Sequence, residues 1–568
     1  MEYLSQADLS ILIVGAAGQG INTAAEVISQ VALWAKFYFF SMIELMSRIR
    51  GGNNSIQMRI GNHPNINAPV SNVDIFIPLN KGAFDHARKM LNDKTLIISD
   101  RPFTNYKTVN VSLLKKANDL GNPVLANIIA ASIITGILGI SPESFKEYIK
   151  KHFSAKGDEA ITKNIKAAGI GYEIAGEILT KGLFSLSIKP LPEINGTIMD
   201  GSEIIGLGAI AGGCNFITAY PMTPASGVWT YLSRHAKRFR IITEQAEDEI
   251  SAINMGLGAS YAGARAMVST SGGGFDLMTE GLSLAGIQET PIVIHLAQRP
   301  GPATGLPTRT EQADLELALY AGHGEFPRIL FAPGTPEQGF FLSQKAFNLA
   351  EKYQIPVFVL TDQYFIDSIY TVQSFGVNKI SIENWVVKSE KDYKRYLLTQ
   401  NGISPRSIPG FGTGFVNADC HHHDEYGHIS EDLELRTEMV NKLMKKANVI
   451  KEEIISPDLV GSNDYKTLVI CWGSNYGVVK EAINSIDNPE IAMLHFSQVF
   501  PLSPEVNNYL EQAKKLIIVE NNATAQFAKL IKLYTGIEIK NKILKYNGLP
   551  FFVEEVRDKI MEYLVDGK

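Results

Sequence analysis

The chain has 568 residues, 45 % of them hydrophobic and 20 % charged, which excludes wholesale disorder and, at roughly 150 residues per domain, predicts three or four domains. A net charge of -6 argues against a general binder of nucleic acid or membrane surfaces. The three cysteines, Cys214, Cys420 and Cys471, are too few for a disulfide scaffold or for an iron–sulfur or zinc site with four cysteine ligands from this chain.

No targeting or membrane-spanning segment is predicted. The N-terminus lacks the basic start of a signal peptide. The most apolar run, residues 128–140, is shorter than the roughly 20 residues that a helix needs to span a bilayer. We therefore expect a cytoplasmic protein that does not insert into membranes.

The first segment, residues 1–185, begins like a βαβ unit. Residues 10–14 form a continuous apolar run typical of a buried parallel strand, and a glycine-rich turn follows it. The next stretch, 21–35, has the apolar spacing of a helix. Further strands are predicted at 73–79 and 95–99.

A second α/β domain is predicted at residues 197–375, after a linker at 186–196. Apolar strands alternate here with helix-length or loop-rich stretches, which is typical of a parallel sheet with helices on both faces. The predicted strands are 217–220, 240–243, 265–271, 291–298 and 356–361.

The alternation breaks at residues 376–460, which carry charge runs, prolines and a glycine cluster, and which we interpret as an extended excursion with little core. It resumes at 461–568. Strands are predicted there at 467–472, 492–495 and 516–520. The sequence therefore predicts an α/β protein with three parallel-sheet domains, of which the last is smaller.

The glycine turn after the first strand is a candidate anion site. Gly15, Gly18 and Gly20, with Gln19 between them, could cradle a phosphate at the N-terminus of the next helix. The spacing is not that of the dinucleotide motif, and close packing of strand and helix also explains the glycines. Arg50 lies in a basic, glycine-containing loop that could meet the same anion or be a plain turn.

Two loops that follow strands of the second domain are candidate ligand sites. Tyr220-Pro221-Met222-Thr223-Pro224 directly follows a strand, where open parallel sheets bind ligands, and its prolines present the Thr223 hydroxyl on a stiff backbone. The alternative is a simple strand-ending turn. The loop 299–310 contains two arginines among prolines and glycines, which suits capture of a carboxylate or phosphate. The alternative is an exposed surface loop.

Two further clusters carry polar side chains. The acidic run 243–249 opens a helix, where the helix dipole favours carboxylates without any function, but the small residues of 256–263 would let a backbone or a flat cofactor approach closely.

The run Cys420-His421-His422-His423-Asp424 contains residue types that can ligate a metal ion. Four adjacent ligands cannot all face one ion without severe contortion of the chain, and the usual zinc spacing is absent. We therefore predict a solvated loop and no metal site.

Together, these motifs resemble the 2-oxoacid:ferredoxin oxidoreductases, specifically an alpha subunit with the gamma domain fused in front, over nearly the whole chain. In the family's order the motifs are Gly15–Gly20, Arg50–Gly52, Tyr220–Pro224, Glu247–Glu249, Thr270–Phe275, Gly301–Thr308 and His423–Gly427. Two departures are Met222, where the family more often has isoleucine, and the unusual Cys420–His422 stretch.

The resemblance implies a gamma-like domain at 1–185, a thiamine-diphosphate pyrimidine-binding-type domain at 197–375 and a transketolase C-terminal-like domain at 461–568. It implies a beta subunit that holds most of the thiamine diphosphate with Mg²⁺ and a 4Fe-4S cluster, which fits a sequence without Gly-Asp-Gly or a ferredoxin-type cysteine run. The implied activity is coenzyme A-dependent oxidative decarboxylation of 2-oxoacids such as pyruvate or 2-oxoglutarate, with ferredoxin as electron acceptor.

The resemblance also implies roles for individual residues. Glu249 best matches the carboxylate that bonds the pyrimidine ring, with Glu247 as the nearby alternative, and Tyr220 and Pro221 belong to the same cofactor site. Arg309 would hold the substrate carboxylate, and Thr223 would bond the same group or the developing alkoxide. Because the gamma-like domain helps to hold coenzyme A in this family, the candidates for its phosphates are Gly15, Gly18, Gln19, Gly20 and Arg50.

Three other interpretations are open. A homomeric transketolase-like enzyme would need both halves of the cofactor site in one chain, which the lack of Gly-Asp-Gly argues against. A non-catalytic regulatory subunit would retain only a vestigial cofactor face. An independent nucleotide-binding protein built on 1–185 would bind a nucleotide with that segment alone.

Overall fold

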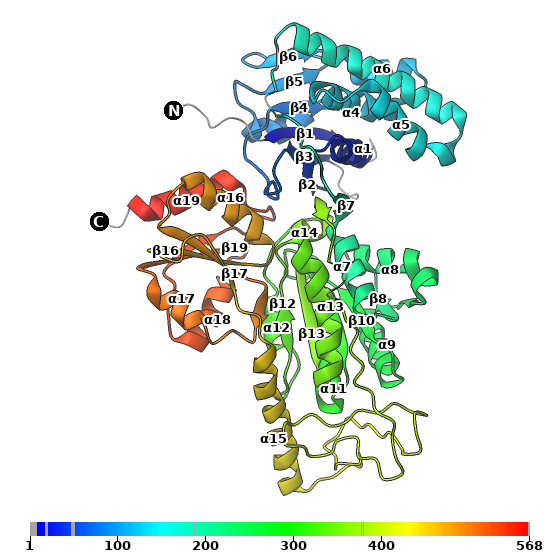
Figure 1. The fold of residues 1–568 in the computed structure, drawn as a ribbon, viewed down its shortest axis with the longest axis vertical. Coiled ribbons are helices and arrows are strands. Elements are labelled where there is room, and N and C mark those ends of the chain that lie inside the picture. The colour runs from blue at the N-terminus through cyan, green and yellow to red at the C-terminus, as the bar shows by residue number, and fades with distance from the viewer. Residues whose placement is uncertain are drawn as a thin grey trace. The chain divides into compact units, whose positions relative to one another are not determined.

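A computed structural model of the chain describes residues 8–16, 21–46, 52–186, 188–376, 378 and 380–565 (Figure 1). They form two compact units. The first contains the chain up to residue 200 with 368–374 and 552–558, and the second contains 201–367, 375–551 and the residues from 559. In the described ranges, no helix has the length and hydropathy needed to cross a bilayer.

The first unit is built on an eight-stranded sheet in the order β6-β5-β4-β1-β3-β2-β14-β7. Its strands are β1 (Asp8–Ala16), β2 (Tyr38–Glu44), β3 (Asn53–Gly61), β4 (Ile75–Pro78), β5 (Leu96–Ser99), β6 (Lys107–Asn110), β7 (Gly196–Asp200) and β14 (Ile369–Gln373). The pairs β1–β4, β4–β5 and β5–β6 are parallel. The other four pairs, β1–β3, β2–β3, β2–β14 and β7–β14, are antiparallel. The predicted strands β1, β4 and β5 are confirmed, whereas the antiparallel half is an addition that the sequence pattern did not indicate.

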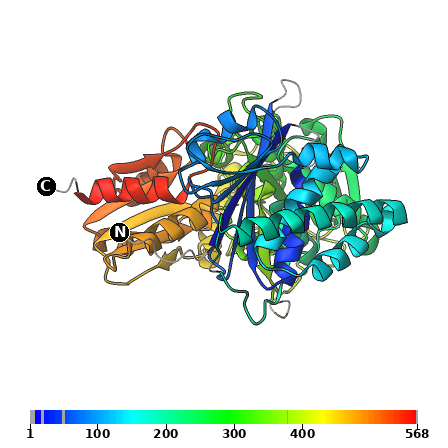
Figure 2. The ribbon, with the colours of Figure 1, turned by 90° about the horizontal axis from the view of Figure 1, so that it is seen from above.

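Helices cover both faces of this sheet because β1 is apolar at every position of its core. Ile11 and Ile13 pack beneath the larger helical layer, and the alternate Leu12 and Val14 face the short α2. The helices are α1 (Ile21–Trp34), α2 (Ala83–Ala87), α3 (Leu113–Asp119), α4 (Ala126–Ile137), α5 (Pro142–His152) and α6 (Asp158–Thr180). Figure 2 shows the large cyan helices together on one side of the blue sheet.

The second unit contains a seven-stranded sheet in the order β18-β12-β13-β11-β10-β8-β9, parallel except for the β12–β18 pair. Its strands are β8 (Phe216–Ala219), β9 (Ile242–Gln245), β10 (Ala266–Thr270), β11 (Ile292–Gln298), β12 (Ile329–Phe331), β13 (Pro356–Asp362) and β18 (Gln498–Phe500). All five strands predicted here are confirmed to within two residues.

Helices lie on both faces of this sheet, as the sequence predicts. Met267 and Val293 point to the face covered by α7, α8 and α13, and Val268 and Ile294 point to the face covered by α9 to α12. The helices are α7 (Gly201–Ala211), α8 (Ser226–Phe239), α9 (Glu249–Tyr261), α10 (Gly272–Leu277), α11 (Thr279–Gln288), α12 (Leu315–Tyr320), α13 (Pro336–Tyr353) and α14 (Gln363–Asp367).

The third sheet, in the order β15-β17-β16-β19-β20, belongs to the same unit and shares its hydrophobic core. Its strands are β15 (Asp458–Val460), β16 (Thr467–Trp472), β17 (Ile491–Phe496), β19 (Lys515–Glu520) and β20 (Asn541–Leu544), and only the β15–β17 pair is antiparallel. The helices of this part of the chain are α16 (Tyr476–Ile486), α17 (Val506–Gln512), α18 (Gln526–Thr535) and α19 (Val553–Val565). In Figure 1, α16 lies on one face of the sheet, and α17 and α18 lie on the other.

The segment between the second and third sheets is mostly irregular up to α15 (Leu433–Val449), a long helix that the sequence pattern did not indicate. Buried polar contacts hold it to the second sheet's helices. Arg406 Nη1 lies 2.8 Å from Glu351 Oε2, and Lys442 and Lys446 of α15 both pair with Glu289 after α11. All five of these side chains are buried.

Candidate active site

Three loops of the second unit meet at one edge of its sheet because parallel strands end at the same edge. The loop 220–224 follows β8, the glycines 272–274 follow β10, and Arg299 follows β11. Since β8 pairs with β10 and β10 with β11, these three loops are neighbours. The first residues of α9 lie at the same edge, after β9.

Glu249 is the first residue of α9, and the helix begins there because Asp248 caps it: the Asp248 carboxylate accepts a 2.7 Å hydrogen bond from the backbone N–H of Ser251. The Glu249 side chain is buried, and its Oε1 has no hydrogen-bond partner. Burial raises the pKa of this carboxyl, and Asp248 raises it further, against the lowering by the backbone N–H and Arg299. Glu249 is therefore a buried carboxyl group with a raised pKa and one oxygen without a hydrogen-bond partner.

Glu247 is placed differently. Its side chain is exposed, and its carboxylate already accepts a 2.8 Å hydrogen bond from Ser251 Oγ. Of the two carboxylates that the sequence analysis considered for bonding a cofactor ring, Glu249 is the one that is buried with a free oxygen.

Glycines are required beside Glu249 because the backbone passes within contact distance. A Cβ at Gly274 would lie 2.6 Å from Glu249 Oε1 and 2.3 Å from Thr270 Oγ1, and one at Gly272 would lie 2.3 Å from the Asp314 carboxylate. No side chain fits at either position without displacing these groups.

Arg299 is one of the two arginines of the 299–310 loop that the sequence analysis considered for capture of an anion, but only Arg309 was given a role of its own. Its side chain is buried, its Nη1 donates a 2.6 Å hydrogen bond to the Thr223 carbonyl, and its Nε has no partner. Burial lowers the pKa of Arg299, while Asp314 and Glu249 raise it. The available signal was its position directly after β11, matching that of the 220–224 loop after β8.

Asp314 is a site residue that the sequence did not single out. Burial raises its pKa to about 7, with further contributions from Glu311 and Asp276, against the opposing effect of Arg299. Its Oδ2 has no hydrogen-bond partner, and neither does the buried Oγ of Ser271. The edge of the sheet thus carries four buried polar atoms without partners, on Glu249, Ser271, Arg299 and Asp314.

The remaining predicted residues of this unit lie in two places. Tyr220, Pro221 and Thr223 are exposed on the loop after β8. Arg309 lies farther along the loop of Arg299: its N–H donates to the Leu306 carbonyl at 3.1 Å, and a Cβ at Gly548 would lie 3.2 Å from its own Cβ. Arg299, not Arg309, is the arginine that holds the Thr223 backbone.

The predicted phosphate turn of the first unit is only partly described. Gly15 is the penultimate residue of β1 and pairs with Asn54 of β3. Gly18, Gln19, Gly20 and Arg50 lie outside the described residues.

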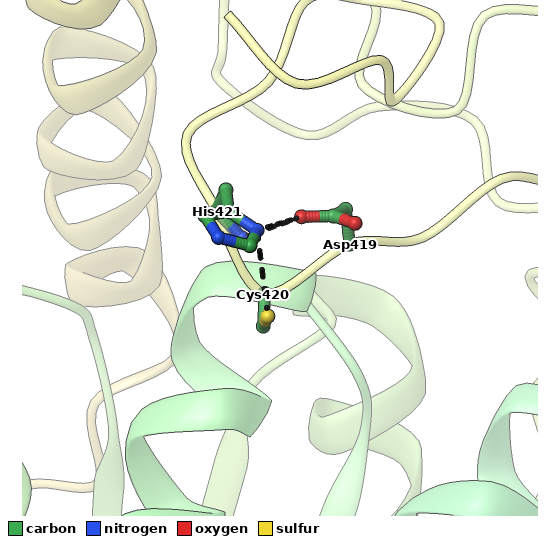
Figure 3. Close-up of side chains that lie close together, drawn as sticks. All are labelled: Asp419, Cys420 and His421. Atoms are coloured by element: carbon green, nitrogen blue, oxygen red, sulfur yellow. Dashed lines mark hydrogen bonds and ion pairs between the residues drawn. The ribbon is translucent and has the colours of Figure 1, made fainter. Parts of the chain in front are cut away.

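In the loop around Cys420, three possible metal-ligand side chains lie close together. From the sequence, we did not expect four adjacent ligand side chains all to face one ion. The ligand atoms of Asp419, Cys420 and His421 all lie within 4.8 Å of one another (Figure 3). His423 is instead buried, with Nδ1 against the His421 carbonyl at 2.9 Å and its ring against Tyr396.

Two family models match most of this chain. Residues 207–442 match the family model described as "Pyruvate flavodoxin/ferredoxin oxidoreductase, thiamine diP-bdg", and residues 10–174 match "Pyruvate ferredoxin/flavodoxin oxidoreductase". A 2-oxoacid:ferredoxin oxidoreductase subunit alpha from Sulfolobus sp. is 32 % identical over 99 % of this chain and 98 % of its own length. A 2-oxoglutarate synthase subunit KorA from Methanocaldococcus jannaschii is 33 % identical over 57 % of this chain and 88 % of its own.

A match among the solved structures extends over almost the full chain. The 2-oxoglutarate:ferredoxin oxidoreductase from Magnetococcus marinus, solved with 2-oxoglutarate, coenzyme A and succinyl-CoA bound, has a TM-score of 0.91 and 29 % identity, covering 98 % of this chain and 100 % of that one.

Proposed function

Since the chain belongs to the 2-oxoacid:ferredoxin oxidoreductases, as an alpha subunit that includes the gamma-like segment, we propose that it acts with a beta subunit. Together they would convert a 2-oxoacid such as 2-oxoglutarate or pyruvate, with coenzyme A, to an acyl-CoA and CO₂ while reducing ferredoxin. The beta subunit would hold the diphosphate, Mg²⁺ and a 4Fe-4S cluster, since two of this chain's three cysteines are buried and distant in sequence. We also propose a cytoplasmic location.

The observation that carries the proposal is the buried carboxyl of Glu249 with a free oxygen at the ligand-binding edge of the sheet. The residues around it fit the polar edge of a thiamine pyrimidine, because four buried polar atoms lack hydrogen-bond partners, and the glycines at 272 and 274 let the backbone pack directly against Asp314 and Glu249. Thiamine diphosphate, when bound, supplies the nucleophilic carbon that attacks the 2-oxo group.

Glu249 is suited to hold a proton at a pyrimidine nitrogen. Its raised pKa brings its proton affinity nearer to that of the ring, and its burial keeps water from competing for the bond. Tyr220 and Pro221, on the exposed loop after β8, would form the wall of the same site.

Thr223 and Arg309 would bind the substrate carboxylate, which must be held still while the bond to it breaks. Arg299 fixes the backbone of Thr223 through its carbonyl and therefore orients that hydroxyl. Its unpartnered Nε makes Arg299 a second candidate for the carboxylate.

The two arginines can be separated by steady-state kinetics. Arg309→Ala should raise KM for the 2-oxoacid by roughly 10- to 100-fold, since a hydrogen bond to a charged group contributes about 1.5–3 kcal/mol, and should leave thiamine binding nearly intact. An unchanged KM in Arg309→Ala together with a raised KM in Arg299→Ala would move the role to Arg299.

Coenzyme A would dock on the gamma-like segment, with Gly15, Gly18, Gln19, Gly20 and Arg50 as candidates for its phosphates. Gly15 is the penultimate residue of β1, the strand that precedes α1, and a turn between a strand and a helix is the arrangement that lets helix N–H groups meet a phosphate. The proposed domain limits are 1–185, 197–375 and 461–568, with 186–196 and 376–460 as connections.

The proposed activity is tested by 2-oxoacid-dependent reduction of a viologen by the chain co-purified with its beta partner, with and without coenzyme A. Reduction that requires both the partner and coenzyme A supports the proposal, and comparing pyruvate with 2-oxoglutarate ranks the substrates. A complex loaded with thiamine diphosphate and iron that reduces nothing would contradict it.

A further inference from the structure

Three donors of different chemistry converge in the loop before α15. His421 Nδ1 lies 2.7 Å from Asp419 Oδ1 and 3.6 Å from Cys420 Sγ. Figure 3 shows the imidazole facing both the carboxylate and the sulfur, with a dashed line to each. The proposed function uses none of these three side chains.

The local backbone explains how adjacent residues can face one point. The Asp419 carboxylate accepts a 2.7 Å hydrogen bond from the backbone N–H of His421, which closes a tight turn and places side chains 419 and 421 on the same side. The next residues are anchored: the Ser430 N–H donates to the His422 carbonyl at 2.9 Å, and the buried His423 ring lies against Tyr396. The three donors therefore project from a turn that is fixed at its C-terminal end.

Two of the three donors, Cys420 and His421, also line a cavity of about 790 Å³ together with residues of α9, α11 and α15. His422, Glu280, His323 and Glu325 are among its other lining residues. A ligand held at the turn would thus have one face open to this cavity.

We propose that Asp419, Cys420 and His421 form a binding site for a borderline-soft divalent metal ion, with Zn²⁺ the best match to one sulfur, one nitrogen and one oxygen donor. Tetrahedral zinc with bonds of about 2.0–2.3 Å separates its ligands by roughly 3.4–3.6 Å. The Cys420–His421 separation of 3.6 Å already meets this, and the Asp419–His421 pair needs to open by less than an ångström.

Binding would replace the hydrogen bonds among the three groups with three metal bonds. The Cys420 thiol releases its proton to solvent, neutral His421 binds through Nδ1, and Asp419 binds as the carboxylate. The fourth position faces the cavity and takes a water, as in zinc sites with three protein ligands.

The test is titration of the untagged, chelator-stripped full chain with Co²⁺, followed by displacement with Zn²⁺. We expect one Co²⁺ per chain and a thiolate-to-cobalt charge-transfer absorption, because Cys420 is the exposed cysteine while Cys214 and Cys471 are buried. Zn²⁺ should abolish the absorption and protect Cys420 from a thiol-modifying reagent.

Cys420→Ser should remove the charge-transfer absorption, and His421→Gln should weaken Co²⁺ binding at least tenfold. The matched control is His428→Gln, an exposed histidine of the same loop that pairs with Asp424 and should bind Co²⁺ as the wild type does. Absence of the absorption in the wild-type chain, or equal Co²⁺ affinity in Cys420→Ser and the wild type, would overturn the proposal.

Discussion

At Glu249, two physical effects act in opposite directions on one carboxyl group. A helix N-terminus favours the ionised form, and the backbone N–H bond lowers the pKa accordingly. Burial without a partner for Oε1 favours the neutral form and is the stronger effect, so the pKa rises. The position at the start of α9 thus orients the Glu249 side chain. The packing of Gly274 against that side chain contributes to the burial that raises its pKa.

Glu249→Gln should lower turnover by two or more orders of magnitude without unfolding the chain, because the amide keeps the shape but cannot exchange a proton at the ring. Glu247→Gln is the matched control, since that carboxylate is exposed and bonded to Ser251. Viologen reduction under saturating 2-oxoacid measures both. Turnover near wild type in Glu249→Gln, with a loss in Glu247→Gln, would reverse the assignment.

Gly274→Ala should impair the site sterically, because the added Cβ would meet Glu249 Oε1 and Thr270 Oγ1 at 2.6 and 2.3 Å. Such overpacking typically costs about 1–3 kcal/mol, and here it would also displace the carboxyl that matters for catalysis. Gly258→Ala in α9 is the control: nothing lies within 4 Å of the added atom, and alanine favours a helix interior by about 1 kcal/mol. The melting temperature should therefore fall in Gly274→Ala and rise in Gly258→Ala. Turnover should fall only in Gly274→Ala.

Among the elements, those buried on both faces could be predicted from the sequence. Strands β11, β13 and β16 are buried at every residue, and most of their residues are therefore apolar. Strand β3 was missed because Gln57 and Arg59 interrupt its pattern while being buried with partners, the Val70 carbonyl and Asp8. The spacing of apolar residues in a sequence does not reveal a hydrogen-bond or ion-pair partner that comes from another part of the chain.

The same limit applies to α15 and to the candidate site. Lys442 and Lys446 look like a solvated helix face in the sequence, yet both are buried against Glu289, which lies on a different element. The loops after β8 and β11 could be predicted as ligand loops because they follow apolar strands. Which arginine of the second loop turns towards Thr223 depends on the path of that loop, which no local pattern specifies.

The end of β13 should make stability depend on pH. Asp362 is buried and accepts hydrogen bonds from Ser474 and from the backbone N–H of Phe365, and burial raises its pKa to about 6. Because its unfolded pKa is about 3.9, the folded state binds more protons between these values, so this residue's contribution to stability falls as pH rises from about 4 to about 6.

Asp362→Asn should remove this dependence while keeping an acceptor for Phe365. The wild type should lose stability relative to the variant as pH rises from 4 to 6, by at most about 3 kcal/mol, as measured from the midpoints of thermal unfolding. The exposed Asp392→Asn serves as the control. A wild-type minus variant difference that stays constant over this pH range would contradict the prediction.

For the whole molecule, Gln312 joins the second and third sheets. Its side chain is fully buried, donates to the Trp472 carbonyl at 3.0 Å and accepts from Asn475 Nδ2 at 2.7 Å, and its backbone N–H donates to Asn521 at 2.7 Å. These bonds complement the shared hydrophobic core and set how the third sheet docks.

Gln312→Ala should loosen the third sheet in particular, because it removes the side chain that donates to the Trp472 carbonyl and accepts from Asn475 Nδ2, and each buried hydrogen bond lost costs about 1–3 kcal/mol. Amide hydrogen exchange should accelerate in β16 and β19 and stay unchanged in the first unit. The exposed Gln400→Ala provides the comparison. Acceleration spread evenly over the chain, or none, would argue against a docking role.

The last two strands of the first sheet, β7 and β14, flank the segment 201–367 in sequence and pair with each other, and β14 also pairs with β2. In hydrogen-bonding terms, that long segment is an insertion between two neighbouring strands of one sheet. A gene divided within 186–196 would therefore assign β7 and β14 to the second polypeptide and leave β2 as an open edge on the first. A two-gene version of this protein would have to rejoin its halves by strand complementation, so the fused gene secures a sheet that would otherwise need assembly between chains.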